Sequence, residues 1–157
     1  MSKVNLIKYF SIVLIAITTF SLQSCKTEGC TDPDSINYDI VADTDDGSCQ
    51  YEGEVVFWYG KNTATNLYYY GSDALTFYVD GQIVGSTNTT VYWTGAPDCG
   101  DNGSITVTMD LGNVKTQSYS YKVIDDLDEE LWTGTINFNA NTCTHFELLW
   151  SKSLKVK

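Results

Sequence analysis

The sequence predicts an all-β protein, an antiparallel β-sandwich of about seven or eight strands preceded by a signal peptide and a small disulfide-closed loop. Composition is the first indication, because 11 Tyr, 6 Phe and 4 Trp stand beside only 2 Pro in 157 residues, and aromatic side chains favour pleated sheets. The second is a series of short runs that alternate apolar and polar residues and end at turn residues. After the N-terminal segment, no helical periodicity extends beyond a turn or two.

The N-terminal segment has the layout of a signal peptide. Lys3 and Lys8 give it a positive start, and residues 9–22 form an apolar run interrupted only by Ser and Thr. A run of 14 residues is too short to span a bilayer comfortably, whereas signal peptides use this length. A transmembrane anchor or a buried helix is the alternative.

The run ends at Ser21-Leu22-Gln23-Ser24-Cys25, which resembles the lipobox of bacterial lipoproteins. The resemblance implies that residues 1–24 are removed and that Cys25 carries acyl chains, palmitate among them, which together make a stable membrane anchor. It also implies a place in the cell envelope, at the outer membrane. Lys26-Thr27-Glu28 resembles surface-export signals, and the face of the membrane stays open.

The predicted mature chain has three parts: a linker module, residues 25–53, a main domain, residues 54–150, and a basic tail, residues 151–157. Its charge argues against nucleic-acid binding. The formal net charge is −11, loss of Lys3 and Lys8 would make it −13, and the chain has no arginine. A nucleic-acid binder needs a basic surface.

Two of the five cysteines, Cys30 and Cys49, bound a short acidic stretch. Gly29-Cys30-Thr31-Asp32-Pro33, Asn37-Tyr38, Ala42 and Asp45-Asp46-Gly47-Ser48-Cys49 together resemble a cysteine-bounded repeat of bacterial secreted and surface proteins. Because export leads to an oxidising compartment, we predict a Cys30–Cys49 disulfide, with pairing to the distant cysteines as the alternative. A bridge around such a loop stabilises the fold by about 3 kcal/mol.

Asp43, Asp45 and Asp46 crowd before Gly47 and raise the question of a calcium site, since Ca²⁺ takes several oxygen ligands. Their spacing does not fit the helix-loop-helix calcium loop, which needs an oxygen where Ala42 stands. We favour a solvated acidic turn in which Asp-Gly serves turn chemistry. No cofactor is expected.

The main domain consists of alternating runs. Asp80-Gly81 between two of them predicts a tight hairpin. The expected strands cover residues 55–59, 75–79, 83–84, 90–94, 104–110, 117–124, 131–138 and 144–150.

Cys99 lies in a loop and Cys143 precedes the last expected strand. A bridge between them would stabilise the fold by roughly 4 kcal/mol, and an exported chain usually pairs its remaining cysteines. The alternative is a reactive thiol at Cys143 beside His145, because side chains two residues apart on a strand share a face. We do not expect an enzyme, and a hydrolase is the weaker alternative.

The stretches Tyr78-Val79-Asp80-Gly81-Gln82-Ile83-Val84-Gly85, Tyr119-Ser120-Tyr121-Lys122-Val123 and Trp132-Thr133-Gly134-Thr135-Ile136 resemble immunoglobulin-like and carboxypeptidase-regulatory-like sandwiches of bacterial surface lipoproteins. The resemblance covers about half of the domain. It implies a scaffolding, presenting or binding role and no catalysis.

Aromatic residues are the candidate ligand contacts: Trp58, Tyr68, Tyr69, Tyr70 and Trp93. Exposed rings stack on sugars or grip a protein partner, but core packing is the favoured alternative because a sandwich needs large side chains. Two hypotheses follow: a surface lipoprotein that binds or displays a glycan or protein, and a structural accessory lipoprotein of the envelope. A contiguous exposed patch of rings would favour the first.

Overall fold

The computed structural model describes residues 26–151. The expected signal peptide, the lipobox with Cys25 and nearly all of the basic tail lie outside the described residues. The described part is mostly β-strand, as predicted, with nine strands and one short helix. Their bounds are β1 Glu28–Gly29, β2 Thr44–Asp45, β3 Tyr51–Trp58, α2 Lys61–Tyr70, β4 Ala74–Val79, β5 Gln82–Asn88, β6 Ile105–Gly112, β7 Thr116–Asp125, β8 Glu130–Asn139 and β9 Cys143–Glu147.

The strands form three sheets. One has the order β6-β3-β9, another β5-β4-β7-β8, and a third contains only β1 and β2. The antiparallel arrangement expected throughout is wrong for β3 and β9, which pair in parallel from Glu54↔Cys143 to Trp58↔Glu147. Hairpin turns dictate antiparallel pairing only between consecutive strands, and these two strands are far apart in the chain.

The two larger sheets pack against each other through aromatic rings. The Phe57 ring on β3 lies 5.7 Å from Phe77 on β4 and 5.8 Å from Tyr121 on β7. Alternation on β4 buries Leu75, Phe77 and Val79, because successive strand residues face opposite sides of a sheet. We call residues 51–151 the β-domain.

Helix α2 follows β3 directly, and the sequence did not predict it. Its buried residues are only Thr63, Ala64 and Leu67, a stripe too narrow to produce a clear helical pattern. The helix ends at Gly71, whose φ of 92° suits glycine and whose N–H bonds the carbonyls of Leu67 and Tyr68.

The strand expected over residues 90–94 is absent from the structure, which has a loop there. Its one ladder contact is an isolated bridge between Trp93 and Gly60. Val91 and Tyr92 are residue types that favour strands, but both side chains are exposed to solvent. Their β propensity is therefore not supported by burial against a sheet.

Both predicted disulfides are present, Cys30–Cys49 and Cys99–Cys143. The first closes the cysteine module, which we define as residues 26–50. The second ties the loop between β5 and β6 to β9.

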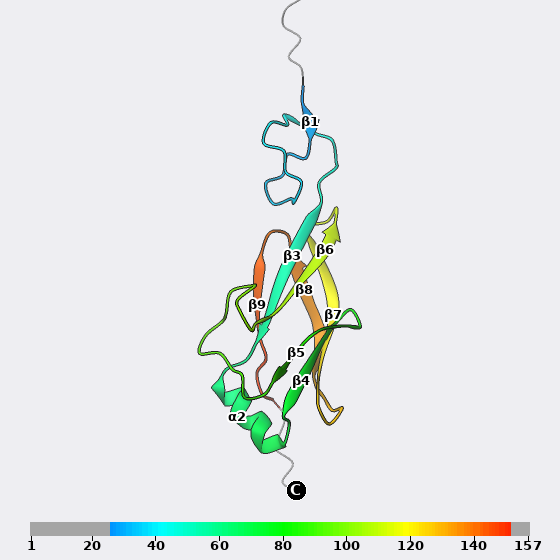
Figure 1. Cartoon of the computed structure of the whole chain (residues 1–157). Helices are drawn as coiled ribbons and strands as arrows, with labels where there is room; N and C mark the ends of the chain where they lie inside the picture. The colour runs from blue at the N-terminus through cyan, green and yellow to red at the C-terminus, as the bar shows by residue number, and fades with distance from the viewer. Residues whose placement is uncertain (1–25, 152–157) are drawn as a thin grey trace, which may run out of the picture.

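The cysteine module docks on one end of the β-domain through polar contacts. The Tyr51 hydroxyl donates to Asp32 at 2.9 Å. Lys115, in the loop between β6 and β7, bonds Asp32 at 2.7 Å and Asp34 at 2.9 Å. Figure 1 places this module and α2 at opposite ends of the molecule.

Among residues 26–151, no helix combines the length and the apolar character needed to cross a membrane.

Candidate functional site

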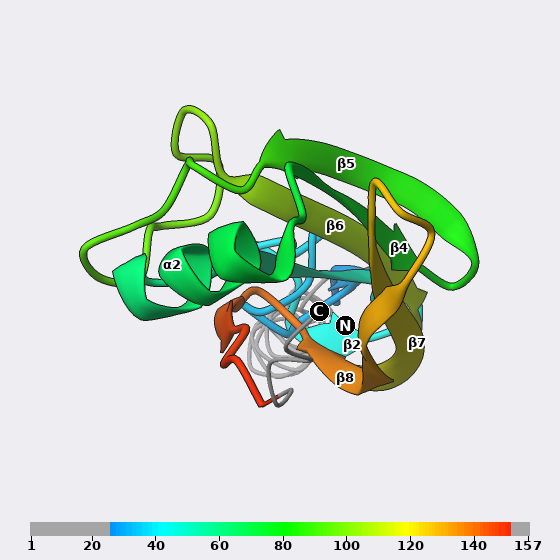
Figure 2. The ribbon, with the colours of Figure 1, turned by 90° about the horizontal axis from the view of Figure 1, so that it is seen from below.

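A shallow groove of about 260 Å³ lies between α2 and the loop that follows β5. Figure 2 shows the helix beside this loop. We call it the tyrosine groove, because three of its lining residues are tyrosines. Its lining is Lys61, Ala64, Thr65, Tyr68, Tyr69, Thr89, Thr90 and Tyr92.

The last turn of α2 supplies two of the three rings. Tyr68 is 73% exposed and Tyr69 is 69% exposed, whereas their neighbour Leu67 is fully buried and fixes the rotation of the helix. The two rings meet edge to face, with centroids 5.7 Å apart and an interplanar angle of 69°. Each ring therefore keeps most of its surface available to a ligand.

The end of the helix is fixed by a hydrogen bond to the larger sheet. The Ser72 hydroxyl, just past the helix, donates to the buried carboxylate of Asp125 at 2.8 Å. The same carboxylate accepts the N–H groups of Leu127 and Glu129. The helix that carries the rings is thus tied to the end of β7.

The opposite wall of the groove is also held in place. The buried Thr89 hydroxyl donates to the carbonyl of Ser72 at 2.8 Å, and its N–H bonds the carbonyl of Asp73. The Tyr59 hydroxyl donates to the carbonyl of Asn88 at 3.1 Å, and burial raises the pKa of Tyr59 to about 12. Because Tyr59 stays protonated at ordinary pH, the loop keeps this donor and presents Tyr92, which is 42% exposed.

Three of the five predicted aromatic contacts do not reach the groove. Tyr70 packs edge-on against Trp150, with ring centroids 5.3 Å apart, and its hydroxyl donates to Glu129, which raises the pKa of Tyr70. Trp58 and Trp93 line a void of only about 10 Å³, which holds at most one water molecule. Tyr92, the third ring of the groove, is not among the predicted contacts, because its approach to α2 depends on the fold.

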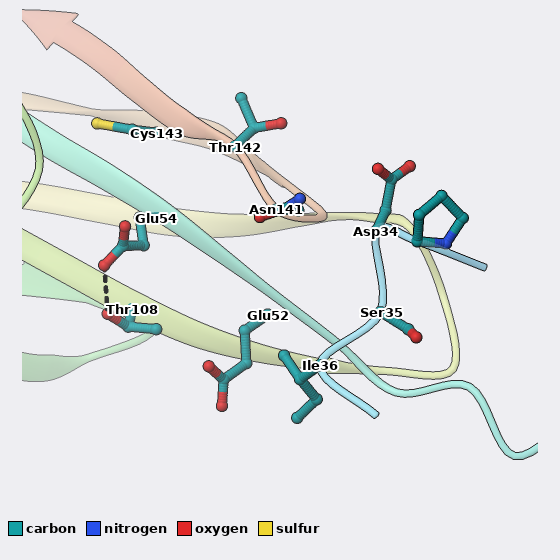
Figure 3. Close-up of a pocket in the computed structure, with 10 residues that line it drawn as sticks. Asp34, Ser35, Ile36, Glu52, Glu54, Thr108, Asn141, Thr142 and Cys143 are labelled. Carbon is teal, nitrogen blue, oxygen red and sulfur yellow. Dashed lines mark hydrogen bonds between the residues drawn. The ribbon is translucent and has the colours of Figure 1, made fainter. Parts of the chain in front are cut away.

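A second hollow, of about 270 Å³, lies where the cysteine module meets the β-domain. Figure 3 shows Glu54 and Thr108 hydrogen-bonded on one side of it and Asp34 on another. Asp34 is already paired with Lys115. Two of the three carboxylates lining this hollow, those of Asp34 and Glu54, are therefore engaged by the protein itself, whereas the rings of the tyrosine groove point to solvent.

The three candidate calcium ligands turn toward backbone N–H groups. Asp43 accepts from Thr27 at 3.1 Å, Asp45 from Gly47 at 3.1 Å, and Asp46 from Ser48 at 2.9 Å. Hydrogen bonds from Ser48 lower the pKa of Asp46. Within residues 26–151, no three His, Cys, Asp or Glu side chains are grouped so as to hold a metal ion.

Cys143 and His145 share a face of β9, as their spacing predicted, with Sγ and Nε2 3.9 Å apart. Cys143 is bonded to Cys99, so it has no thiol to act as a nucleophile. His145 Nε2 lies 3.8 Å from Asp98, whose side chain is 93% exposed.

Comparisons with protein-family models, with curated proteins and with solved structures found no match.

Proposed function

We propose that this chain is a non-catalytic surface lipoprotein of the bacterial envelope that binds a glycan in the tyrosine groove. Cys25 would carry the lipid and anchor the protein at the outer membrane. The β-domain would be a sandwich of the immunoglobulin-like or carboxypeptidase-regulatory-like kind. The observation that carries the proposal is the grouping of Tyr68, Tyr69 and Tyr92 around one groove.

The exposure of these rings favours binding over a purely structural role. The core of the β-domain already contains Phe57, Phe77 and Phe138 and gains little from Tyr68 or Tyr69, which lie mostly in water. Contiguous exposed apolar surface of this kind marks interaction sites. A structural accessory protein has no need of a ring cluster at one end.

The chemistry of the groove favours a glycan. Phenol rings stack on the C–H faces of sugars, while the Thr90 hydroxyl and the Lys61 ammonium group line the same groove and can bond sugar hydroxyls. The Thr65 hydroxyl donates to the carbonyl of Lys61 at 2.9 Å and can still accept a hydrogen bond. The chain's net charge of −11 repels acidic ligands, so a neutral glycan fits better than a sulfated or uronic one.

The position of the groove fits an N-terminal anchor. Helix α2 lies at the end of the molecule opposite the cysteine module (Figure 1), and the proposed lipid precedes that module in the chain. An anchor there would hold the cysteine module toward the membrane and leave the groove facing outward.

The test is a glycan array probed with the oxidised chain from residue 26 onward. We expect binding to neutral glycans, and the double variant Tyr68→Ala/Tyr69→Ala should lose about tenfold in affinity, given about 0.5–1.5 kcal/mol per ring contact. Tyr38→Ala, an exposed tyrosine of the cysteine module, is the matched control. Unchanged glycan binding by the double variant would contradict the proposal. If the same rings bind a protein and no glycan, the ligand of the groove is a protein.

A further inference from the structure

Two aliphatic side chains form the tip of a turn in the cysteine module. Ile40 is 82% exposed and Val41 is 66% exposed, and both lie inside a turn closed by the Ala42 N–H bonding the carbonyl of Asp39 at 3.1 Å. Central turn positions favour polar residues, Gly or Pro. Two adjacent aliphatic residues at an exposed tip therefore have no explanation in the turn itself.

The turn has a defined shape. The Asp39 carboxylate accepts the Val41 N–H at 3.0 Å, and the Asp39 N–H bonds the carbonyl of Cys30 at 2.9 Å. A Cβ atom added at Gly29 would lie 3.2 Å from the Cβ of Ala42, so β1 packs closely on the base of the turn. The aliphatic tip is therefore held out into solvent.

The turn also lies close to Thr27, the residue through which the described chain continues toward Cys25. The Thr27 carbonyl accepts the N–H groups of Asp43 at 3.0 Å and Thr44 at 3.3 Å, and the Thr27 N–H donates to Asp43. Thr27 is two residues from Cys25, and Asp43 is two residues from Val41. Because two residues span at most about 7 Å, a lipid on Cys25 would hold the tip within reach of the headgroup layer.

We propose that Ile40 and Val41 insert into the headgroup layer of the membrane that holds the anchor, as a second and non-covalent membrane contact. The lipid surface would be zwitterionic, because the module has seven carboxylates and one lysine, Lys26, and an anionic surface would repel it. This contact sets the tilt of the cysteine module on the membrane. It rests on the proposed lipid anchor.

The test is fluorescence quenching on phosphatidylethanolamine vesicles that carry lipids brominated near the headgroup. The oxidised mature chain is attached through Cys25, either by its own lipid or by a maleimide lipid, so that the readout does not depend on lipidation in the cell. Ile40→Trp is compared with Ile83→Trp, a position on β5 of the β-domain that is 66% exposed, as Val41 is. Signal from the native tryptophans is subtracted with the unsubstituted chain.

We expect Ile40→Trp to lose about half of its added emission, since shallow insertion reaches 5–10 Å into the headgroup region, and Ile83→Trp to lose none. Val41→Trp should behave like Ile40→Trp and guards against a local effect of one substitution. Equal emission loss at positions 40 and 83 would overturn the proposal. Quenching that appears only at high protein density would also overturn it, because the tip would then contact a second copy of the protein and not the lipid. If the maleimide-linked protein is quenched but the protein made in cells is absent from the membrane fraction, only the proposed natural lipid anchor is refuted.

Discussion

The cysteine module keeps its larger apolar side chains in water, whereas the β-domain encloses a core of large apolar side chains. Ile36, Tyr38, Ile40 and Val41 are all exposed, and the buried apolar residues of the module are the half-cystines Cys30 and Cys49. The β-domain instead supplies Phe57, Phe77 and Phe138 to a continuous core, to which the module adds only Cys30 and Cys49. One region therefore depends on a covalent bridge and charged contacts, and the other on hydrophobic burial.

Because the two regions are stabilised differently, different changes should disrupt them. The largest effect is expected in the core. Phe57→Ala removes the ring that joins both larger sheets and should lower the free energy of unfolding by about 3–5 kcal/mol. Urea denaturation followed by tryptophan fluorescence measures this, with Tyr38→Ala as the exposed control. A loss no larger than that of the control would contradict the assigned packing.

Loss of the module disulfide should act locally. Cys30→Ser/Cys49→Ser should lower the stability of residues 26–50 by about 3 kcal/mol and leave the core of the β-domain folded. Amide hydrogen exchange checks this, with faster exchange expected in the module and unchanged exchange in β4 and β7. Equal acceleration in both regions would show that they unfold as one unit.

The docking of the module should depend on pH. The hydrogen bond from Lys115 holds the pKa of Asp32 below its usual value of 3.8. A carboxylate with a lowered pKa contributes stability above its unfolded pKa, and this contribution is lost as the pH falls through the folded value. We expect the module to detach in acid below about pH 4, and at milder acidity in high salt, because Lys115 is half-exposed and Asp32 is partly exposed, so that salt screens their attraction.

The ring resonances of Tyr51 report this detachment by NMR, because Tyr51 donates to Asp32. Asp32→Asn should remove most of the pH response, while Asp39→Asn, in the same module, should keep it. The same acid transition in Asp32→Asn would show that another group controls docking.

The smallest effect on stability is expected in the tyrosine groove. Tyr68→Ala and Tyr69→Ala should each change the free energy of unfolding by no more than about 0.5 kcal/mol, because exposed side chains contribute little. Thermal unfolding measures this. A loss above about 2 kcal/mol would mean that the rings support the fold and would weaken their assignment to binding.

The strands and the disulfides were predictable because they depend on local patterns. Alternation identified β4, β7 and β8, and Asp80-Gly81 identified the hairpin that follows β4. The parallel pairing of β3 with β9 was not predictable, since it joins strands separated by most of the domain. Helix α2 was missed because only Thr63, Ala64 and Leu67 are buried on it.

The candidate site was predictable only in part. The Tyr68-Tyr69-Tyr70 run pointed to exposed rings, but the sequence could not show that Tyr70 turns to Trp150. Tyr92 reaches the groove through the hydrogen bonds of Thr89 to the residues after α2, which are contacts of the folded chain. Trp58 and Trp93 have the residue type of a sugar contact, yet they line a void rather than the groove.

The most direct test is NMR titration of the oxidised β-domain and module with the glycan that binds on the array. The account predicts that the ring signals of Tyr68, Tyr69 and Tyr92 shift together and saturate. Signals of Glu52 and Glu54, which line the polar hollow between the cysteine module and the β-domain, should stay in place. Shifts confined to the polar hollow, with the three tyrosines unmoved, would contradict the assignment of binding to the tyrosine groove.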